Sequence, residues 1–482
     1  MENQQVKTPS PLLSLVPIFV LVFLLFVTIR AFGSDALNGG SQIVLLATTA
    51  VCSFIAMVVC KVRWKSIETS IVNNITGVAA ALLILLIIGS ISGSWMISGV
   101  VPTLIYYGTQ LIHPTFFLAS TCIICSIVSV MTGSSWTTIA TIGIALLGIG
   151  QAQGYDEGWI AGAIISGAYF GDKISPLSDT TVLASSITNT PLFTHIRYML
   201  ITTVPSMTIS LLIFTIAGFF HEATSSNQIA QFSLSLKESF NISGWLLIVP
   251  IVTGLLIARK VPPLITLFIS SALAGVFALF FQPDLLAEIA GEDAVGATAT
   301  FKGFMKMFYG STQIETGNAE LNDLVSTRGM SGMLSTIWLI ICAMCFGGAM
   351  AASGMLGSIT ILFVRFMKRT VGTVASTVAS GLFFNICTAD QYMSIILTGN
   401  MFKDIYKQKG YESRLLSRTT EDSVTVTSPL IPWNTCGMTQ ATILGVATLT
   451  YLPYCFFNII SPLMSIFIAA TGYKIKRTHE KD

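Results

Sequence analysis

Long apolar runs are the feature that most constrains the fold of this chain. Leu12–Ala31 and Ser41–Cys60 each have about the 20 residues that a helix needs to cross a bilayer. Only 10% of the 482 residues are charged, whereas soluble domains carry about 25%. Because lipid offers an open backbone no hydrogen-bond partners, such runs cross as helices. The sequence therefore predicts an all-α polytopic membrane protein. Further runs occur at Ile196–Phe220, Gly244–Ala258, Pro263–Phe281 and Tyr451–Thr471.

Basic residues beside these runs indicate the orientation. Lys61–Lys65, directly after the second run, contains three basic residues, and the final run leads into the basic segment Tyr473–Arg477. Loops rich in lysine and arginine stay on the cytoplasmic side of a membrane. We therefore expect a multi-pass protein whose N- and C-termini are both cytoplasmic.

Small polar residues predict breaks inside several apolar runs. Gly77–Ile112 is too long for one straight span and is interrupted at Ser92–Ser94 and at Ser98–Gly99. Met330–Phe366 is interrupted in the same way at Ser353–Gly354. Further broken segments are expected at Trp159–Asn189 and Thr419–Val446.

The spacing of these landmarks indicates that the chain contains two related halves. The intervals from Ser98 to Thr132 and from Ser353 to Thr388 are 34 and 35 residues. A Ser-Pro-Leu sequence follows 77 residues after Ser98 and 75 residues after Ser353. Ordered agreement of several landmarks indicates an internal repeat, and a repeat fixes the architecture.

The loops that connect corresponding segments carry opposite charge. Gln151–Gly158 contains two acidic residues and no basic one, whereas Phe402–Arg418 contains five basic residues. The repeats should therefore have inverted topology. The apolar pieces on either side of Thr132–Ser135 and of Thr388–Asp390 are short, which favours re-entrant hairpins over pairs of full spans. About ten crossings plus two hairpins are expected.

This reading divides the chain into four parts. Residues 1–76 form two N-terminal transmembrane helices, and residues 77–220 form transport repeat 1. Residues 221–329 form connecting helices and a long extracytoplasmic loop, and residues 330–482 form transport repeat 2 with a C-terminal helix.

The stretch Gly171–Thr181 is the strongest candidate for a functional site. It contains Asp172, Lys173 and Asp179 among hydroxyls, close to apolar runs. A carboxylate at the bilayer centre costs about 2.5–3.5 kcal/mol, so a buried one is by default a functional site. Pro176 should break the helix there and leave carbonyls and hydroxyls free to bind a small cation. The alternative is an ordinary polar loop at the membrane surface.

Hairpin tips and broken helices of the two repeats supply the candidate site residues. Hard oxygen ligands of this kind suit Na⁺ better than soft metals. The candidates for binding Na⁺ or a proton are Asp172, Asp179, Asp422 and Asp390, with Na⁺ held at Asp172, Asp179 and Asp422. The supporting ligands are Thr132, Ser134, Ser135, Ser175, Ser178, Thr180, Asn385, Thr388, Ser428, Asn434 and Thr435.

Two charged neighbours have less certain roles in the sequence. Lys173 either neutralises an acid of the site or extends toward the membrane interface, because a long lysine side chain can keep its charge in water. Glu421 is interpreted as a charge at a helix end.

Three stretches resemble the NhaC-type Na⁺/H⁺ antiporter family. They are Gly171–Thr181, Trp95–Gly99 with Pro102–Gly108, and Glu421–Ser423 with Ser428–Gly437. The resemblance implies exchange of Na⁺ for H⁺ across a bacterial cytoplasmic (inner) membrane. Some relatives of this kind exchange organic acids, such as malate for lactate, with coupled Na⁺ and H⁺.

The expected function is therefore secondary transport. One carboxylate that holds either a proton or Na⁺, but not both, is sufficient for antiport, and Asp172 is the first candidate with Asp179 as its partner. The alternative is a Na⁺- or H⁺-coupled antiporter of organic acids, of the malate/lactate type, or an amino-acid carrier.

An enzyme is not expected, because no convincing nucleophile–base pair is present, and no cofactor is expected beyond the transported Na⁺ and H⁺. The absence of a phosphate-binding Gly-Lys-Ser/Thr loop argues against ATP hydrolysis. The expected partners are membrane lipid, Na⁺ and H⁺, with a small organic anion as the alternative cargo and a homodimer as an assembly that the sequence allows. Nucleic acid is not among them.

Overall fold

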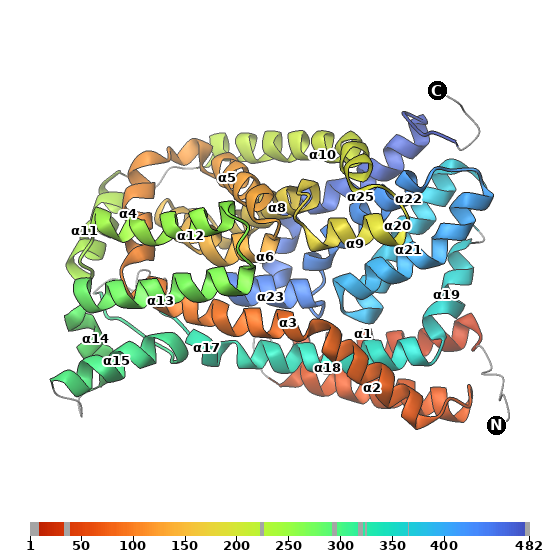
Figure 1. Cartoon of the computed structure of the whole chain (residues 1–482), viewed down its shortest axis with the longest axis horizontal. Coiled ribbons are helices and arrows are strands. Elements are labelled where there is room, and N and C mark those ends of the chain that lie inside the picture. Colours follow the sequence, from red (N-terminus) through yellow and green to blue (C-terminus); the bar gives the residue numbers. More distant parts are fainter. Residues whose placement is uncertain are drawn as a thin grey trace.

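The computed structural model of the protein describes residues 9–32, 39–221, 226–291, 296–316, 322, 325–364 and 366–477. Within these residues nine helices are long and apolar enough to cross a membrane, and two sharply bent pairs bring the number to eleven. The bent pairs are Ser233–Ser239 with Gly244–Ala258, at 93°, and Thr448–Tyr454 with Phe456–Thr471, at 55°. The predicted all-α polytopic membrane fold is confirmed, and Figure 1 shows the helices packed in one bundle.

The chain begins with α1 and α2, which pack against each other and against helices of the second half. The long helix α3 then runs through the bundle and meets α18 and α13 (Figure 1). The helices of this part are α1 (Pro11–Phe32), α2 (Gly40–Val58), α3 (Trp64–Ile97) and α4 (Val100–Leu111).

The first hairpin and the broken helix after it follow α4. Their tight packing is clearest between α5 and α8, where glycine allows close approach. A Cβ at Gly167 would lie 2.2 Å from the carbonyl oxygen of Cys122. The helices are α5 (Phe117–Thr132), α6 (Ser135–Thr138), a π-helical turn (Ile139–Gly143), α7 (Ile144–Ala152), α8 (Glu157–Ile174), α9 (Asp179–Ile187) and α10 (Leu192–Phe220).

The connecting region contains more helix than the sequence suggested. Residues 282–329 are the part of segment 221–329 that was expected to form the long loop, because they include no long apolar run. They hold two amphipathic helices that pack together and against α3 and α13. The helices of this region are α11 (Ser226–Ser239), α12 (Ile248–Ala258), α13 (Pro263–Phe281), α14 (Pro283–Ala290) and α15 (Ala297–Tyr309).

The second half repeats the order of hairpin and broken helix. Its broken helix passes through a π-helical turn (Glu421–Thr425) and is interrupted at Ser428–Asn434 before α23 begins. The helices are α17 (Gly329–Gly332), α18 (Leu334–Ala352), α19 (Met355–Val364), α20 (Thr370–Thr388), α21 (Gln391–Gln408), α22 (Ser413–Thr420), α23 (Thr435–Leu444), α24 (Thr448–Tyr451) and α25 (Phe456–Thr471).

Hydrogen bonds at the two hairpin tips follow the same pattern in both halves, as the predicted internal repeat requires. The Thr132 hydroxyl donates to the Ser134 carbonyl at 3.1 Å, and the Thr388 hydroxyl donates to the Asp390 carbonyl at 3.0 Å. The same two carbonyls each accept a second hydrogen bond, from the Thr138 hydroxyl at 2.9 Å and from the Ser394 hydroxyl at 2.7 Å. Corresponding residues are 256 positions apart, as from Thr132 to Thr388.

The predicted break at Ser98–Gly99 is confirmed, because α3 ends at Ile97 and Gly99 adopts a positive φ of 85°. The predicted break at Ser92–Ser94 is wrong, since α3 is continuous there. Gly93 instead allows close packing: a Cβ at this position would lie 2.0 Å from the carbonyl oxygen of Met307. The division proposed between residues 76 and 77 falls inside α3.

Candidate ion-binding site

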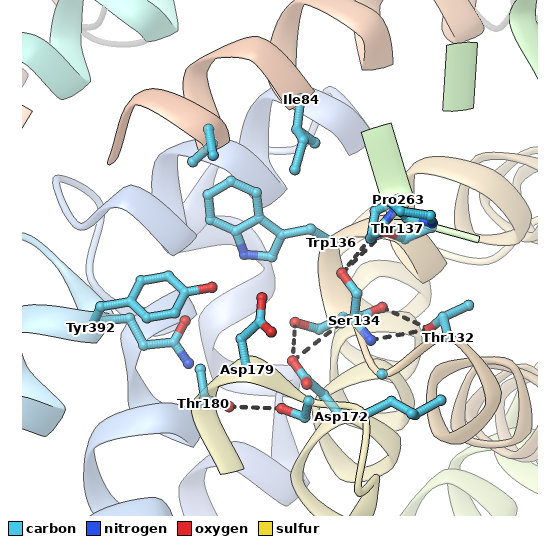
Figure 2. Close-up of a pocket in the computed structure, with 18 of the residues that line it drawn as sticks. Ile84, Thr132, Ser134, Trp136, Thr137, Asp172, Asp179, Thr180, Pro263 and Tyr392 are labelled. Atoms are coloured by element: carbon cyan, nitrogen blue, oxygen red, sulfur yellow. Dashed lines mark hydrogen bonds between the residues drawn. The ribbon is translucent and has the colours of Figure 1, made fainter. Parts of the chain in front are cut away.

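A cavity of about 580 Å³ lies where the two repeats meet. Its walls come from both hairpin tips, from both broken helices, from α3 and from the turn between α12 and α13. Figure 2 shows how side chains from these elements surround one space. Three of the four predicted acids line it: Asp172, Asp179 and Asp390. The predicted supporting residues that line it are Thr132, Ser134, Ser135, Ser178, Thr180 and Thr435.

Asp172 lies in the last turn of α8 with only 6% of its surface exposed. One of its carboxylate oxygens accepts hydrogen bonds from the backbone N–H of Ser135 at 3.2 Å and from the Ser135 hydroxyl at 2.7 Å (Figure 2). Ser135 is the first residue of α6, so the carboxylate faces a helix start whose free N–H groups favour negative charge. The pair joins the first hairpin tip to α8.

The first hairpin tip, Thr132–Ser135, fits tightly against the break between α8 and α9. Gly133 has a φ of 66°, and a Cβ there would lie 2.6 Å from the Cβ of Leu177. Ser178 caps α9 by accepting from the backbone N–H of Thr181 at 3.4 Å. The next residue, Asp179, is therefore placed in the first turn of α9 with an exposed side chain that lines the cavity.

The second hairpin tip, Thr388–Asp390, has its acid in a different setting. Asp390 caps α21 by accepting from the backbone N–H of Met393 at 2.8 Å, and its other oxygen accepts from the Thr435 hydroxyl at 3.2 Å. The backbone N–H of Thr435 also donates to the Ala389 carbonyl at 2.8 Å. Asp390 therefore joins a hairpin tip to a broken helix, as the Ser135–Asp172 pair does in the first half.

Asp422 is not brought to this cavity. It forms an ion pair with Lys173 and accepts from the Thr202 hydroxyl at 3.0 Å, and its second oxygen lies 3.8 Å from Nε of Arg418. Lys173 also donates to the Ser461 hydroxyl at 3.0 Å. All of these side chains are fully buried. The structure thus gives Lys173 the first of its two predicted roles, with Asp422 as the acid that it neutralises.

The remaining predicted ligands hold backbone at the breaks and do not line the cavity. Ser175 donates to the Val130 carbonyl at 2.8 Å, and Asn385 donates to the Val424 carbonyl at 2.7 Å. Ser428 donates to the Thr425 carbonyl at 2.8 Å. Thr388 bonds within its own hairpin tip, and Asn434 caps α23.

Three residues that line the cavity, Trp136, Tyr392 and Lys260, are not among the site residues that the sequence predicts. Glu421, interpreted from the sequence as a charge at a helix end, is instead fully buried in the π-helical turn. Trp136 and Tyr392 are 256 residues apart, so aligning the hairpin tips by the internal repeat would have paired them.

The three carboxylates that line the cavity suit a cation. No basic side chain in the described parts of the chain forms an ion pair with Asp172, Asp179 or Asp390. In the same parts, no three acidic, histidine or cysteine side chains converge as a metal-binding group. A cation in the cavity would therefore be held by carboxylates together with hydroxyls or water.

Several known proteins are similar to this chain over most of its length. The sequence matches the Na⁺/H⁺ antiporter family over residues 2–165 and 167–473. The Malate-2H⁺/Na⁺-lactate antiporter of Bacillus subtilis is 37% identical over 412 residues, 85% of each chain. The Na⁺/H⁺ antiporter NhaC of the same organism is 34% identical over 84% of this chain and 87% of its own. NhaC of Alkalihalophilus pseudofirmus is 37% identical over 88% of this chain and 89% of its own.

These matches cover most of this chain and of each relative. Two of the three acids of the cavity, Asp172 and Asp179, lie in Gly171–Thr181, one of the stretches that resemble this family. The chain therefore belongs to the Na⁺/H⁺ antiporter family.

Proposed function

We propose that the protein exchanges Na⁺ for H⁺ and that Asp172 is the carboxylate that holds one or the other. The observation that carries this proposal is the position of Asp172. It is nearly buried, lines the cavity between the repeats and forms no ion pair with a basic side chain of the described residues. A buried carboxylate without a cationic partner must acquire a cation or a proton, since an isolated buried charge is costly.

The neighbours of Asp172 support competition between the two ions. Ser135 donates twice to the charged carboxylate, and Asp179 adds a second negative charge in the same cavity. Lys173 cannot serve as a ready internal cation for Asp172, because it is engaged by Asp422. Binding of Na⁺ therefore requires loss of the proton from Asp172, and binding of the proton removes the charge that retains Na⁺.

The cavity wall also suggests the side of access in this arrangement. Lys260, next to Arg259, lies in the turn before α13 and lines the cavity. The positive-inside rule assigns that turn, the basic C-terminal segment and the N-terminus to the cytoplasm of an inner membrane. The proposed arrangement is therefore open toward the cytoplasm. Alternating access would follow from motion of one inverted repeat against the other.

A dicarboxylate cargo is the second candidate, because one relative is named a malate/lactate antiporter. Three carboxylates and a single lysine line the cavity, which favours a cation. Measuring the transport of malate and lactate by the protein in liposomes distinguishes a dicarboxylate cargo from Na⁺.

Exchange in liposomes tests the proposal. The purified chain is reconstituted with a trapped pH-sensitive dye, and the proton flux that an imposed Na⁺ gradient drives is recorded. Asp172→Asn should reduce this flux to the level of empty vesicles, because an amide cannot offset the dehydration of Na⁺. Asp404→Asn is the matched control, since Asp404 is an exposed acid of α21 outside the cavity. Near wild-type exchange by Asp172→Asn would place the ion site elsewhere.

A further inference from the structure

The two hairpins place one aromatic side chain each at corresponding positions of the cavity wall. Trp136 follows the first hairpin tip and Tyr392 follows the second, 256 residues later. Both line the cavity, although Tyr392 keeps 38% of its surface exposed. A small inorganic cation is held by oxygen ligands, so the paired aromatic rings remain unexplained by Na⁺ exchange.

The carboxylates lie beside these rings. In Figure 2 Asp179 points toward the indole of Trp136 and the hydroxyl of Tyr392, and Asp172 lies on the other side of Asp179 from these rings. Aromatic faces attract organic cations within about 6 Å of the ring, most strongly when water is displaced. Rings together with unpaired carboxylates form the combination that recognises an ammonium group attached to a hydrocarbon body.

The size of the cavity also exceeds what Na⁺ needs. Its volume is about 580 Å³, whereas one water occupies roughly 30 Å³ in the liquid. Sites for small organic molecules measure about 300–1,000 Å³. Ile84, which lies near the indole of Trp136 in Figure 2, and Leu183 add apolar side chains to the cavity wall, which suits a hydrocarbon body.

We propose that this cavity also binds a small organic ammonium ion, with its charged group at Asp179 and Asp172 and its hydrocarbon body between Trp136 and Tyr392. The three carboxylates disfavour an organic anion of the same size. Because the ammonium group occupies the acids assigned to Na⁺, the two cations compete. The competition rests on the proposed Na⁺ exchange, whereas binding of the amine does not.

Three probes of equal size and different charge test this inference: benzylammonium, benzyl alcohol and benzoate. Binding to the purified full chain in lipid nanodiscs is measured by calorimetry in an amine-free potassium buffer. Benzylammonium should bind at least tenfold more tightly than benzyl alcohol, and benzoate should not bind. Added NaCl should lower the affinity for benzylammonium. Equal binding of amine and alcohol, or no amine binding, overturns the proposal.

Substitutions then locate the site. Tyr392→Leu and Trp136→Leu should each lower the affinity for benzylammonium at least tenfold. Each should lower the affinity for Na⁺ by a smaller factor. Trp245→Leu is the matched control, because Trp245 is 68% exposed and does not line the cavity. Unchanged amine affinity in both cavity variants would show that the amine binds elsewhere and overturn the proposal.

Na⁺/H⁺ exchange, recorded on the same preparations, separates this inference from the proposed function. Exchange without amine binding refutes the organic cation site alone. Amine binding without exchange refutes the proposed function and leaves the site standing.

Discussion

Asp172 and Asp422 are both buried carboxylates on broken helices, but the structure gives them opposite surroundings. Asp172 lines the cavity and accepts hydrogen bonds from Ser135 without an ion-pair partner in the described residues. Asp422 is closed in with Lys173 and lies near Arg418. The contrast teaches that burial alone does not describe a buried acid, because its partners decide whether its charge is already compensated.

The physical reason is that Lys173 is a cation attached to the chain. A transported ion leaves an acid when its binding is weak enough, whereas a lysine ammonium stays within reach of its partner. Separating a buried pair leaves an uncompensated charge, which costs about 3–5 kcal/mol. The Asp422 cluster is therefore suited to hold the repeats together, because Lys173 belongs to α8 of the first repeat and Asp422 to the second.

The largest expected effect concerns the stability of that cluster. Asp422→Asn leaves both Lys173 and Arg418 without their acid, and we expect a loss of about 3–5 kcal/mol in the free energy of unfolding. Lys173→Met should cost less, because Asp422 keeps Arg418. Asp172→Asn should cost little, since it removes a charge without stranding another. Thermal unfolding of the purified variants in detergent shows which variant loses the most stability. Equal stability of Asp422→Asn and Asp172→Asn would contradict the comparison.

The next effect concerns the hydrogen bonds that Ser135 donates to Asp172. Ser135→Ala removes the hydroxyl donor at 2.7 Å and keeps the backbone donor at 3.2 Å. A hydrogen bond to a charged group contributes about 1.5–3 kcal/mol, so the apparent Na⁺ affinity should fall about tenfold or more. Exchange rates in liposomes over a series of Na⁺ concentrations give this affinity. Ser175→Ala is the control, because Ser175 bonds the Val130 carbonyl outside the cavity wall. An equal fall in both variants would remove the special role of Ser135.

A smaller effect is expected at Asp179, which is exposed in the cavity and is a supporting acid in this scheme. Asp179→Asn should weaken the apparent Na⁺ affinity several-fold and leave most of the maximal rate, because Asp172 still binds both ions. The same liposome titration separates affinity from maximal rate. Complete loss of exchange would make Asp179 an essential acid beside Asp172 and would revise the single-carboxylate scheme.

The last prediction concerns access of water. In a background without the nine native cysteines, Ser134→Cys in the cavity wall should react with a small polar thiol reagent, and Na⁺ should slow the reaction several-fold. Ser461→Cys, beside Lys173 in the closed cluster, should react far more slowly. Mass spectrometry of the labelled protein follows both. Similar labelling rates at the two positions would show that both regions are hydrated and would contradict the contrast between the cavity and the Asp422 cluster.

The sequence by itself determined much of this protein. A bilayer tolerates neither open backbone nor stray charge, so spans, breaks and buried acids leave local patterns such as Gly171–Thr181 and Ser353–Gly354. Those patterns predicted the all-helical membrane fold, the internal repeat, the family, and the acids that line the cavity. They also predicted a break at Ser92–Ser94 that does not exist, because the contact of Gly93 with α15 leaves no local mark.

The tertiary structure decided which residues become partners. Lys173 and Asp422 are 249 positions apart, so no local pattern distinguishes a paired acid from a free one. Trp136 and Tyr392 share a cavity because two hairpin tips converge, and the burial of Glu421 depends on the helices that surround its turn. The charges that face the cavity come from residues far apart in the sequence, so only long-range packing of the helices decides which of them meet.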